Sequence, residues 1–153
     1  MLRLSKLADY GTVVMVYLAR HPEQFCNARV LAAHTHLGVP TVSKLLKILA
    51  NANLVASQRG TKGGYKLSRS AAQISITHII AAVEERTGLT ECSHHGSQCV
   101  LQPVCSIRDN WQILSHAITE ALESVSLSAL AQPRFKVHEV DVSRIKQLHT
   151  SME

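Results

Sequence analysis

A glycine-rich segment in the first half of the chain, Arg59-Gly60-Thr61-Lys62-Gly63-Gly64, restricts the fold most. It separates two short runs typical of β-strands, and glycine supplies the positive φ angles that tight turns require. The strands are expected at residues 54–57 and 65–68. Ahead of them, apolar residues recur at helical spacing in three stretches, about residues 5–20, 27–35 and 40–51. Three helices followed by a hairpin is the order of a winged helix-turn-helix, so we expect a mainly α fold with a small β-hairpin wing.

The third helical stretch has two chemically different faces. Its apolar face carries Val42, Leu45, Leu46 and Leu49. Its polar face carries Ser43, Lys44, Lys47 and Asn51. Pro40 suits the first turn, where its missing N–H costs little. Such a helix packs its apolar face on the domain and can place its polar face in the major groove of DNA.

Charge is distributed unevenly along the 153 residues, whose formal net charge is +5. Residues 1–75 hold ten Lys and Arg against two acids, a net of +8, whereas residues 76–153 hold six against nine, a net of −3. A basic half suggests an anionic partner, and double-stranded DNA fits because phosphate contacts dominate its binding energy. A solvated basic surface is the alternative. Without an apolar run of ~18 residues or a secretory signal, we expect a cytoplasmic protein with no membrane partner.

The second half begins with a fourth predicted helix, residues 76–87. A heptad-like stripe follows at spacings of 4, 3, 4, 3 and 4, through Ile107, Trp111, Leu114, Ile118, Ala121 and Val125. A helix this long needs a partner for its stripe, and a second copy of the chain is the economical one, with packing onto its own domain as the alternative. The predicted organisation is a DNA-binding domain over 1–75, a linking helix and cysteine-rich loop over 76–105, a dimerisation helix over 106–131 and a flexible tail over 132–153.

Three cysteines, Cys92, Cys99 and Cys105, form a C-x6-C-x5-C pattern within 14 residues. In a cytosolic chain, clustered cysteines bind metal or act in redox chemistry more often than they form disulfides. Three thiolates on one loop can hold an iron–sulfur cluster or a zinc ion. His94 and His95 lie inside the loop and either could ligate, although surface histidines are the simpler interpretation. Cys26 stands apart and is expected to be a buried, small apolar residue.

Together these features resemble the Rrf2 family of bacterial transcription regulators, over roughly residues 1–130. The resemblance is carried by Leu7-Ala8-Asp9-Tyr10, by the wing from Arg59 to Leu67, and by the three-cysteine loop before a long helix. It implies a homodimer that binds operator DNA and senses through an iron–sulfur cluster, 2Fe–2S or 4Fe–4S, with no small-molecule substrate. Within the family the chain looks most like regulators of the SUF cluster-assembly operon. The family's iron–sulfur cluster regulators and its nitric-oxide-sensing repressors are close rivals.

The resemblance also implies ligands for the cluster. It assigns Cys92, Cys99 and Cys105 as three of them. One branch of the family has a histidine three residues after the last cysteine, but here that position is Arg108, a cation that cannot ligate iron. Another branch takes a carboxylate from the first helix of the partner subunit, and Asp9 matches that position. We therefore expect Asp9, supplied in trans, as the fourth ligand in preference to the histidines, although an acid early in a helix is also favoured by the helix dipole.

For DNA, the resemblance places base-facing residues at Thr41, Ser43 and Lys44 and a phosphate contact at Lys47. Arg59 matches an arginine at the base of the wing that enters the minor groove, and Lys62 lies in the same turn. One branch of the family has an acidic residue at the position of Ser43, so the specificity it confers should be absent or altered here.

Other classes of protein fit this sequence less well or remain as alternatives. The chain has no nucleotide-binding loop, no G-x-S-x-G elbow and no H-E-x-x-H motif, so an enzyme is not expected. A DNA-binding regulator switched by zinc or by a disulfide remains open. An adaptor that uses its winged helix to bind protein is a third possibility.

Overall fold

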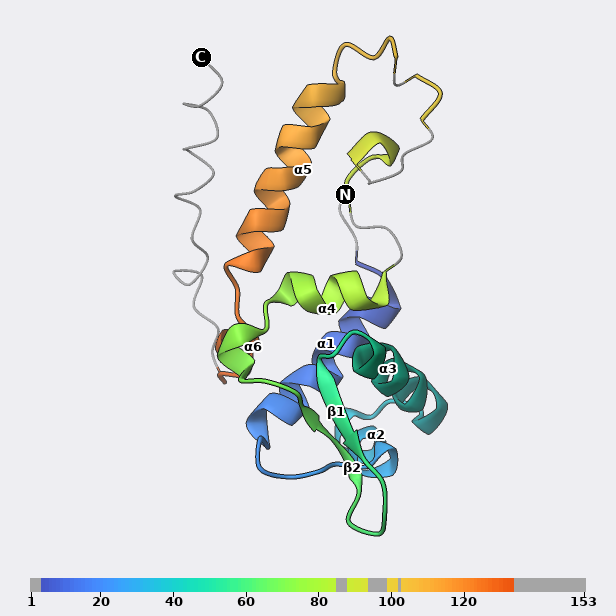
Figure 1. Ribbon diagram of the computed structural model, residues 1–153, viewed down its shortest axis with the longest axis vertical. Helices are drawn as coiled ribbons and strands as arrows, with labels where there is room; N and C mark the ends of the chain where they lie inside the picture. The colour runs from blue at the N-terminus through green and yellow to red at the C-terminus, as the bar shows by residue number, and fades with distance from the viewer. Residues whose placement is uncertain (1–3, 85–87, 94–98, 102, 134–153) are drawn as a thin grey trace.

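The computed structural model describes residues 4–84, 88–93, 99–101 and 103–133, and in this part the chain is mainly helical with one β-hairpin (Figure 1). Three helices come first, at the positions predicted: α1 (Lys6–Arg20), α2 (Ala28–Thr35) and α3 (Val39–Asn51). The Ser5 hydroxyl accepts a hydrogen bond from the Ala8 N–H at 3.1 Å, and the Asn27 side chain accepts one from the Val30 N–H at 3.0 Å. These bonds satisfy amide groups that a helix start otherwise leaves free.

The core lies between these helices. The predicted apolar face of α3 is confirmed, because Val42, Leu45, Leu46 and Leu49 are all 0% exposed. They share one cluster with Val14, Met15 and Leu18 of α1. Burial of several such side chains stabilises the fold by roughly 1.5–3 kcal/mol each. With its apolar face held in this core, α3 can present only its opposite face outward.

The hairpin is made of β1 (Val55–Gln58) and β2 (Gly64–Leu67), antiparallel, with Val55 opposite Leu67 and Gln58 opposite Gly64. It is anchored to the loop between α1 and α2, because Cys26 and Tyr65 exchange two backbone hydrogen bonds of 2.9 Å. A Cβ atom on Gly64 would lie 2.7 Å from the carbonyl carbon of Cys26, so this close approach requires glycine. Cys26 itself is 4% exposed, as expected.

The remaining described elements are short except for one. They are η1 (Ala71–Gln73), α4 (Ile76–Val83), η2 (Glu91–Ser93), α5 (Arg108–Glu123) and α6 (Leu127–Leu130). The helix predicted over 76–87 ends at Val83, with Glu84 as its C-cap, and residues 85–87 lie outside the described part. Most of the predicted tail, residues 134–153, also lies outside it.

The single long helix expected over 106–131 is divided in two. α5 ends at Glu123, and Ser126 caps α6 by accepting a hydrogen bond from the Ala129 N–H. Between them the Ile76 N–H donates to the Val125 carbonyl at 3.0 Å, and the Leu127 N–H donates to the Ile74 carbonyl at 2.7 Å. The helix is interrupted because these backbone groups bond to the start of α4 rather than within α5. We call residues 124–126 and 74–76 the joint.

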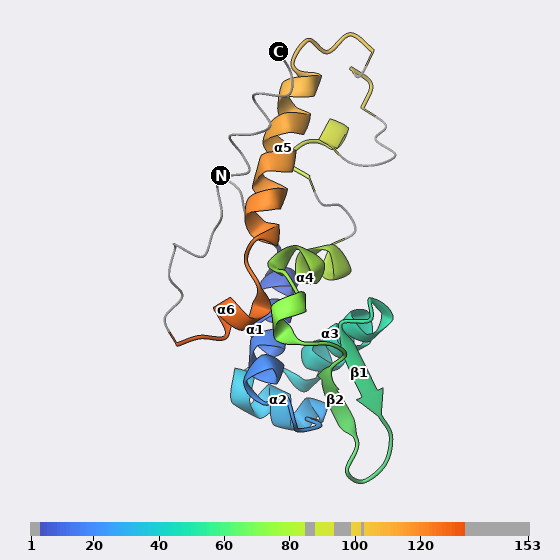
Figure 2. The ribbon, with the colours of Figure 1, turned by 60° about the vertical axis from the view of Figure 1, so that its left-hand side comes forward.

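The joint divides the molecule into two unequal regions. The hydrophobic core that includes α1 and α3 also contains residues of α4, together with Val125 and Leu127. The domain therefore extends beyond residue 75, where its end was predicted. η2, α5 and the described residues between them form a second region that we call the arm, within residues 88–123. The arm projects from the domain on the side away from the hairpin (Figure 1), and a second view shows the same arrangement (Figure 2). Among the described helices, none combines the length and the apolar character needed to cross a membrane.

Candidate nucleic-acid interface and cysteine-bearing arm

The outward face of α3 carries the residues expected to contact DNA. Lys44 and Lys47 are exposed, and Thr41 and Ser43 are half-buried. All four lie on α3 and outside the buried row of Val42, Leu45, Leu46 and Leu49. The packing of the leucines therefore determines which way these polar side chains face.

The turn between β1 and β2 carries the other two predicted DNA contacts. Arg59 and Lys62 are exposed there. The Gly63 N–H donates to the Gly60 carbonyl at 3.0 Å, and Gly60 has a φ of 114°, which favours glycine. On β2, the Lys66 ammonium lies 4.7 Å from the centre of the Phe25 ring, a cation–π contact that holds the hairpin to the loop before α2. The turn thus presents two cations on a hairpin anchored at its base.

The three clustered cysteines lie on the arm, away from the hairpin. All three are of intermediate exposure. The Thr90 hydroxyl lies 3.1 Å from the Cys92 sulfur, and the Gln112 side-chain amide donates to the Cys92 carbonyl at 3.4 Å. Cys105 lies three residues before the start of α5. The segment that bears the thiols is therefore connected to the first two turns of α5.

Gln112 was not singled out by the sequence, and nothing in the sequence marks it. Its partner is a backbone carbonyl 20 positions away, which any residue type can offer. Only the folded chain shows that this glutamine holds η2 against α5.

The described residues contain no group of three or more His, Cys, Asp or Glu side chains arranged to hold a metal ion. Cys92, Cys99, Cys105 and Asp9 are thus not brought together within one chain. Asp9 is exposed in the first turn of α1. His94 and His95 lie outside the described residues.

The donor set nevertheless fits an anionic metal cluster chemically. Three cysteine side chains on one segment are the ligand type that iron–sulfur clusters take. Arg108 follows Cys105 by three residues, and its Nε atom is buried with no hydrogen-bond partner among the described residues. A buried cationic donor is costly when unpaired, and a thiolate-bound cluster would supply the missing negative charge.

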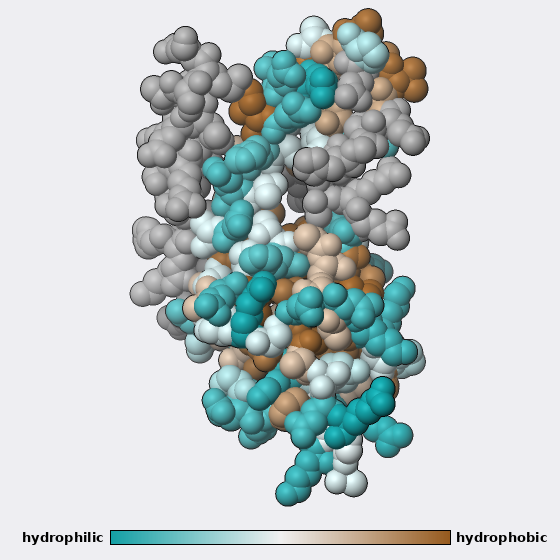
Figure 3. All heavy atoms as spheres, viewed as in Figure 1, coloured by the Kyte–Doolittle hydropathy of each residue, from teal (hydrophilic) through white to brown (hydrophobic). Residues whose placement is uncertain are grey.

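The first half of α5 exposes large apolar side chains. They are Ile107, Trp111, Ile113 and Leu114, preceded by Val100, Leu101 and Val104. Figure 3 shows apolar atoms at the end of the molecule formed by this part of the arm and polar atoms at the hairpin end. The predicted stripe therefore has two environments, since Val125 lies in the domain core whereas Trp111 and Leu114 are not covered.

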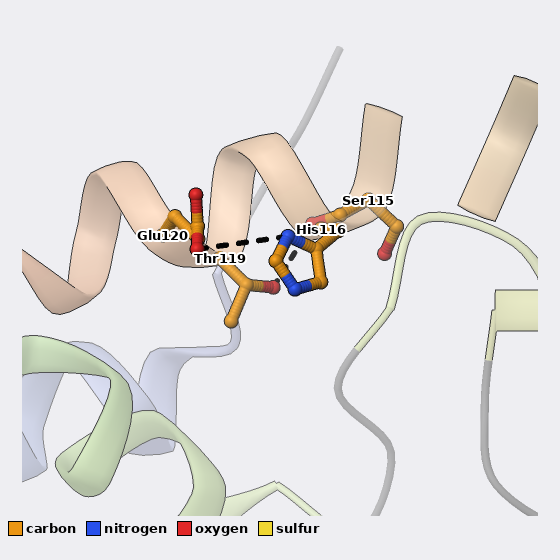
Figure 4. Close-up of polar contacts among 4 residues, drawn as sticks. All are labelled: Ser115, His116, Thr119 and Glu120. Carbon is orange, nitrogen blue, oxygen red and sulfur yellow. Dashed lines mark hydrogen bonds and ion pairs between the residues drawn. The ribbon is translucent and has the colours of Figure 1, made fainter. Parts of the chain in front are cut away.

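Another side of α5 is polar and makes contacts within the helix itself (Figure 4). The Thr119 hydroxyl donates to the Ser115 carbonyl at 2.9 Å. The His116 Nδ1 atom lies 3.9 Å from a Glu120 carboxylate oxygen, a one-turn pair that contributes little at an exposed site. These contacts support the helix locally and leave its apolar residues as the surface that has most to gain from a partner.

A three-helix unit with a hairpin wing and a basic outer face defines a winged-helix DNA-binding regulator. Residues 4–133 match the Rrf2 family, described as an iron-dependent transcriptional regulator, and the chain belongs to this family. Its relatives are transcriptional regulators, which confirms the prediction that the protein is not an enzyme.

Individual relatives align with this chain over most of its length. The transcriptional regulator NsrR of Geobacillus kaustophilus is 29% identical over 135 residues, covering 87% of this chain and 92% of its own. The regulator IscR of Vibrio cholerae is 31% identical over 154 residues, covering 99% and 86%. Among solved structures, CymR, the global cysteine regulator of B. subtilis, has a TM-score of 0.67 at 29% identity, covering 86% of this chain and 97% of its own. IscR of T. potens has a TM-score of 0.66 at 27% identity, covering 84% and 86%.

Proposed function

We propose that this protein is a homodimeric regulator that reports iron–sulfur cluster status to DNA. α3 and the wing bind a palindromic operator, and Cys92, Cys99 and Cys105 hold a cluster, of which 2Fe–2S is the preferred type. The single observation that carries the proposal is the group of three cysteines on the segment that leads into α5, a helix with exposed apolar residues. The resemblance of the wing and the cysteine loop to regulators of cluster assembly suggests that its targets, in the cytoplasm, are the genes of that pathway.

DNA binding is supported by the position of the cations. Lys44 and Lys47 on α3 and Arg59 and Lys62 on the wing are all exposed, so four positive charges are free to meet phosphates or base edges. A recognition helix enters the major groove with its N-terminal residues against the bases, which agrees with Thr41 and Ser43 as base contacts. The wing then follows the adjacent backbone and minor groove, where Arg59 is best suited.

A second copy of the chain is proposed to cover the exposed side of α5. Exposed large apolar side chains on one helix favour association, and two-fold dimers are the commonest soluble oligomers. The same association would bring Asp9 of the partner subunit within reach of the cysteine segment, which explains why one chain alone does not assemble four ligands.

The chain's own contacts supply a route from the thiols to the DNA-binding face. Cys92, Cys99 and Cys105 would hold the iron–sulfur cluster, which would supply thiolate–iron bonds that are lost when oxidation destroys the cluster. Gln112 and the start of α5 connect the cysteine segment to the helix. α5 leads to the joint, where Val125 and Leu127 bond to Ile76 and Ile74 of the domain. Altering the cysteine segment therefore changes the position of α5 on the domain and, in a dimer, the spacing of the two recognition helices.

The test is an anaerobic preparation of the full chain supplied with iron and sulfide. We expect visible absorption, with iron and sulfide bound in equal amounts, and we expect Cys92→Ala to abolish both. Cys26→Ala is the matched control, because this thiol is buried in the domain core, and the variant should keep its colour. Zinc without iron or sulfide, or undiminished colour in Cys92→Ala, would contradict the cluster assignment and favour a zinc- or disulfide-switched regulator.

A further inference from the structure

An apolar side chain stands at the very start of the recognition helix. Val39 is the first residue of α3 and is 42% exposed. It lies one turn before Ser43, so the two side chains are neighbours on the same side of the helix. Lys44 and Lys47 add charge to the exposed surface, and Val39 and Pro40 are the exposed apolar residues beside the predicted base contacts.

The surroundings of Val39 leave its methyl groups accessible. Gly38 precedes it as the N-cap and makes no side-chain capping bond, in contrast to Ser5 on α1 and Asn27 on α2. A Cβ placed on Gly38 would meet only Pro40 and Thr41, each at 3.8 Å, so the residue before Val39 has open space around it. A β-branched side chain in a helix has one strongly preferred χ1 rotamer, so the two methyl groups of Val39 point in a fixed direction.

We propose that Val39 contacts the 5-methyl group of a thymine in the major groove, next to the base that Ser43 faces. This assignment rests on the proposed DNA-binding function. Among the four bases, only thymine presents a methyl group in the major groove, and apolar side chains recognise it there. The N-terminal residues of a recognition helix are the ones that reach base edges, and Val39 begins that segment. Exposed valines elsewhere on helices, such as Val30 on α2 at 38%, lack this position.

The experiment uses the full chain and a duplex that it selects from a randomised DNA pool. Each thymine of the selected sequence is replaced in turn by deoxyuridine, which differs only by the missing methyl group. We expect about a fourfold loss of affinity at one thymine of each half-site, the effect of burying one methyl group, and no loss at the others. Val39→Ser should bind the thymine and deoxyuridine duplexes equally, whereas the matched control Val30→Ser should keep the fourfold preference.

The outcomes separate this inference from the function beneath it. A protein that selects a duplex but tolerates deoxyuridine at every position overturns the assignment of Val39 and leaves DNA binding intact. Retention of the preference in Val39→Ser overturns it as well. Failure to select any duplex overturns both the proposed function and this assignment.

Discussion

The domain and the arm use the same kinds of residue in opposite ways. In the domain, Leu45, Leu46 and Leu49 repeat along α3 and are 0% exposed. In the arm, apolar residues repeat along α5 as regularly, yet Leu114 is 47% exposed and Val104, ahead of the helix, is 80% exposed. The difference shows that the domain buries the apolar face of α3 within one chain, whereas the described part of the arm leaves large apolar side chains exposed.

The two regions also differ in what they bond to. The domain is held by contacts between distant segments, such as Cys26 with Tyr65 and Ile76 with Val125. On α5, by contrast, side chains bond within one turn of the helix, as Thr119 does with the Ser115 carbonyl and His116 with Glu120. A region that is stabilised locally can shift as a unit about the joint at lower cost than a region locked by its own core.

The largest effect is expected from truncating a leucine in the domain, and the same truncation in the arm serves as the comparison. Leu45→Ala should lower the free energy of unfolding by about 3 kcal/mol, because it opens a cavity in a closed core. Leu114→Ala should lower it by less than about 1 kcal/mol but weaken self-association. Urea unfolding at fixed concentration and sedimentation would measure the two effects. Equal destabilisation by both variants would mean that the arm is as fully packed as the domain.

The second largest effect is a difference in thiol reactivity between the domain and the arm. In apo protein, Cys26 should react with iodoacetamide at least about a hundredfold more slowly than the three arm cysteines, because reaction needs an opening of the core. Burial also raises the pKa of the Cys26 thiol, so less thiolate is present at neutral pH and its rate should climb as the pH rises. Mass spectrometry would count modified thiols, and denaturant should make all four react. Rapid native labelling of Cys26 would contradict a closed domain.

A glycine substitution tests how tightly the wing is joined to the domain. Gly64→Ala should cost about 2 kcal/mol, because the added Cβ meets backbone atoms of Cys26 that cannot move aside. Gly38→Ala is the matched control, since its Cβ would meet nothing closer than 3.8 Å, and its stability should change by no more than about 0.5 kcal/mol. Thermal unfolding compares them. Equal melting temperatures for the two variants would contradict the close approach of β2 to Cys26.

The smallest effect concerns DNA affinity at the end of the domain farthest from the arm. Arg59→Ala should weaken binding to a selected duplex about tenfold at moderate salt, because it removes a specific contact and a charge. Arg69→Ala is the matched control, because it removes the same charge just after β2. It should lose only the general electrostatic contribution to DNA affinity, a decrease of less than about threefold. Fluorescence anisotropy gives both affinities. Equal losses of affinity in the two variants would mean that Arg59 contributes only its charge and makes no specific contact.

The DNA-binding half could be predicted closely because its signals are local. Pro40 in a first turn and the glycine-rich turn each specify structure within a few residues, and both occur where expected. The apolar period of α3 named its buried residues correctly, since four leucines and valines on one face can be covered only from one side. The candidate DNA contacts on α3 and on the wing come from the resemblance to the Rrf2 family, and they remain predictions.

The arm was predicted less well because its order depends on distant partners. The heptad-like stripe implied one helix to residue 131, but the chain leaves α5 at Glu123 to bond with Ile74 and Ile76. The spacing of apolar residues within 107–125 does not indicate that the chain will bond to residues about fifty positions earlier. The division of the stripe into a buried end and an exposed end is likewise invisible in its period.

The amino-acid sequence by itself therefore determined the order of helices and hairpin, the orientation of α3 and the grouping of three thiols, because each depends on neighbours along the chain. Tertiary structure alone decided where the long helix stops, that α4 and α6 belong to the DNA-binding domain, and that Gln112 holds the cysteine segment. Those features arise from backbone groups and apolar surfaces that any residue types can offer, and only three-dimensional packing selects which of them meet.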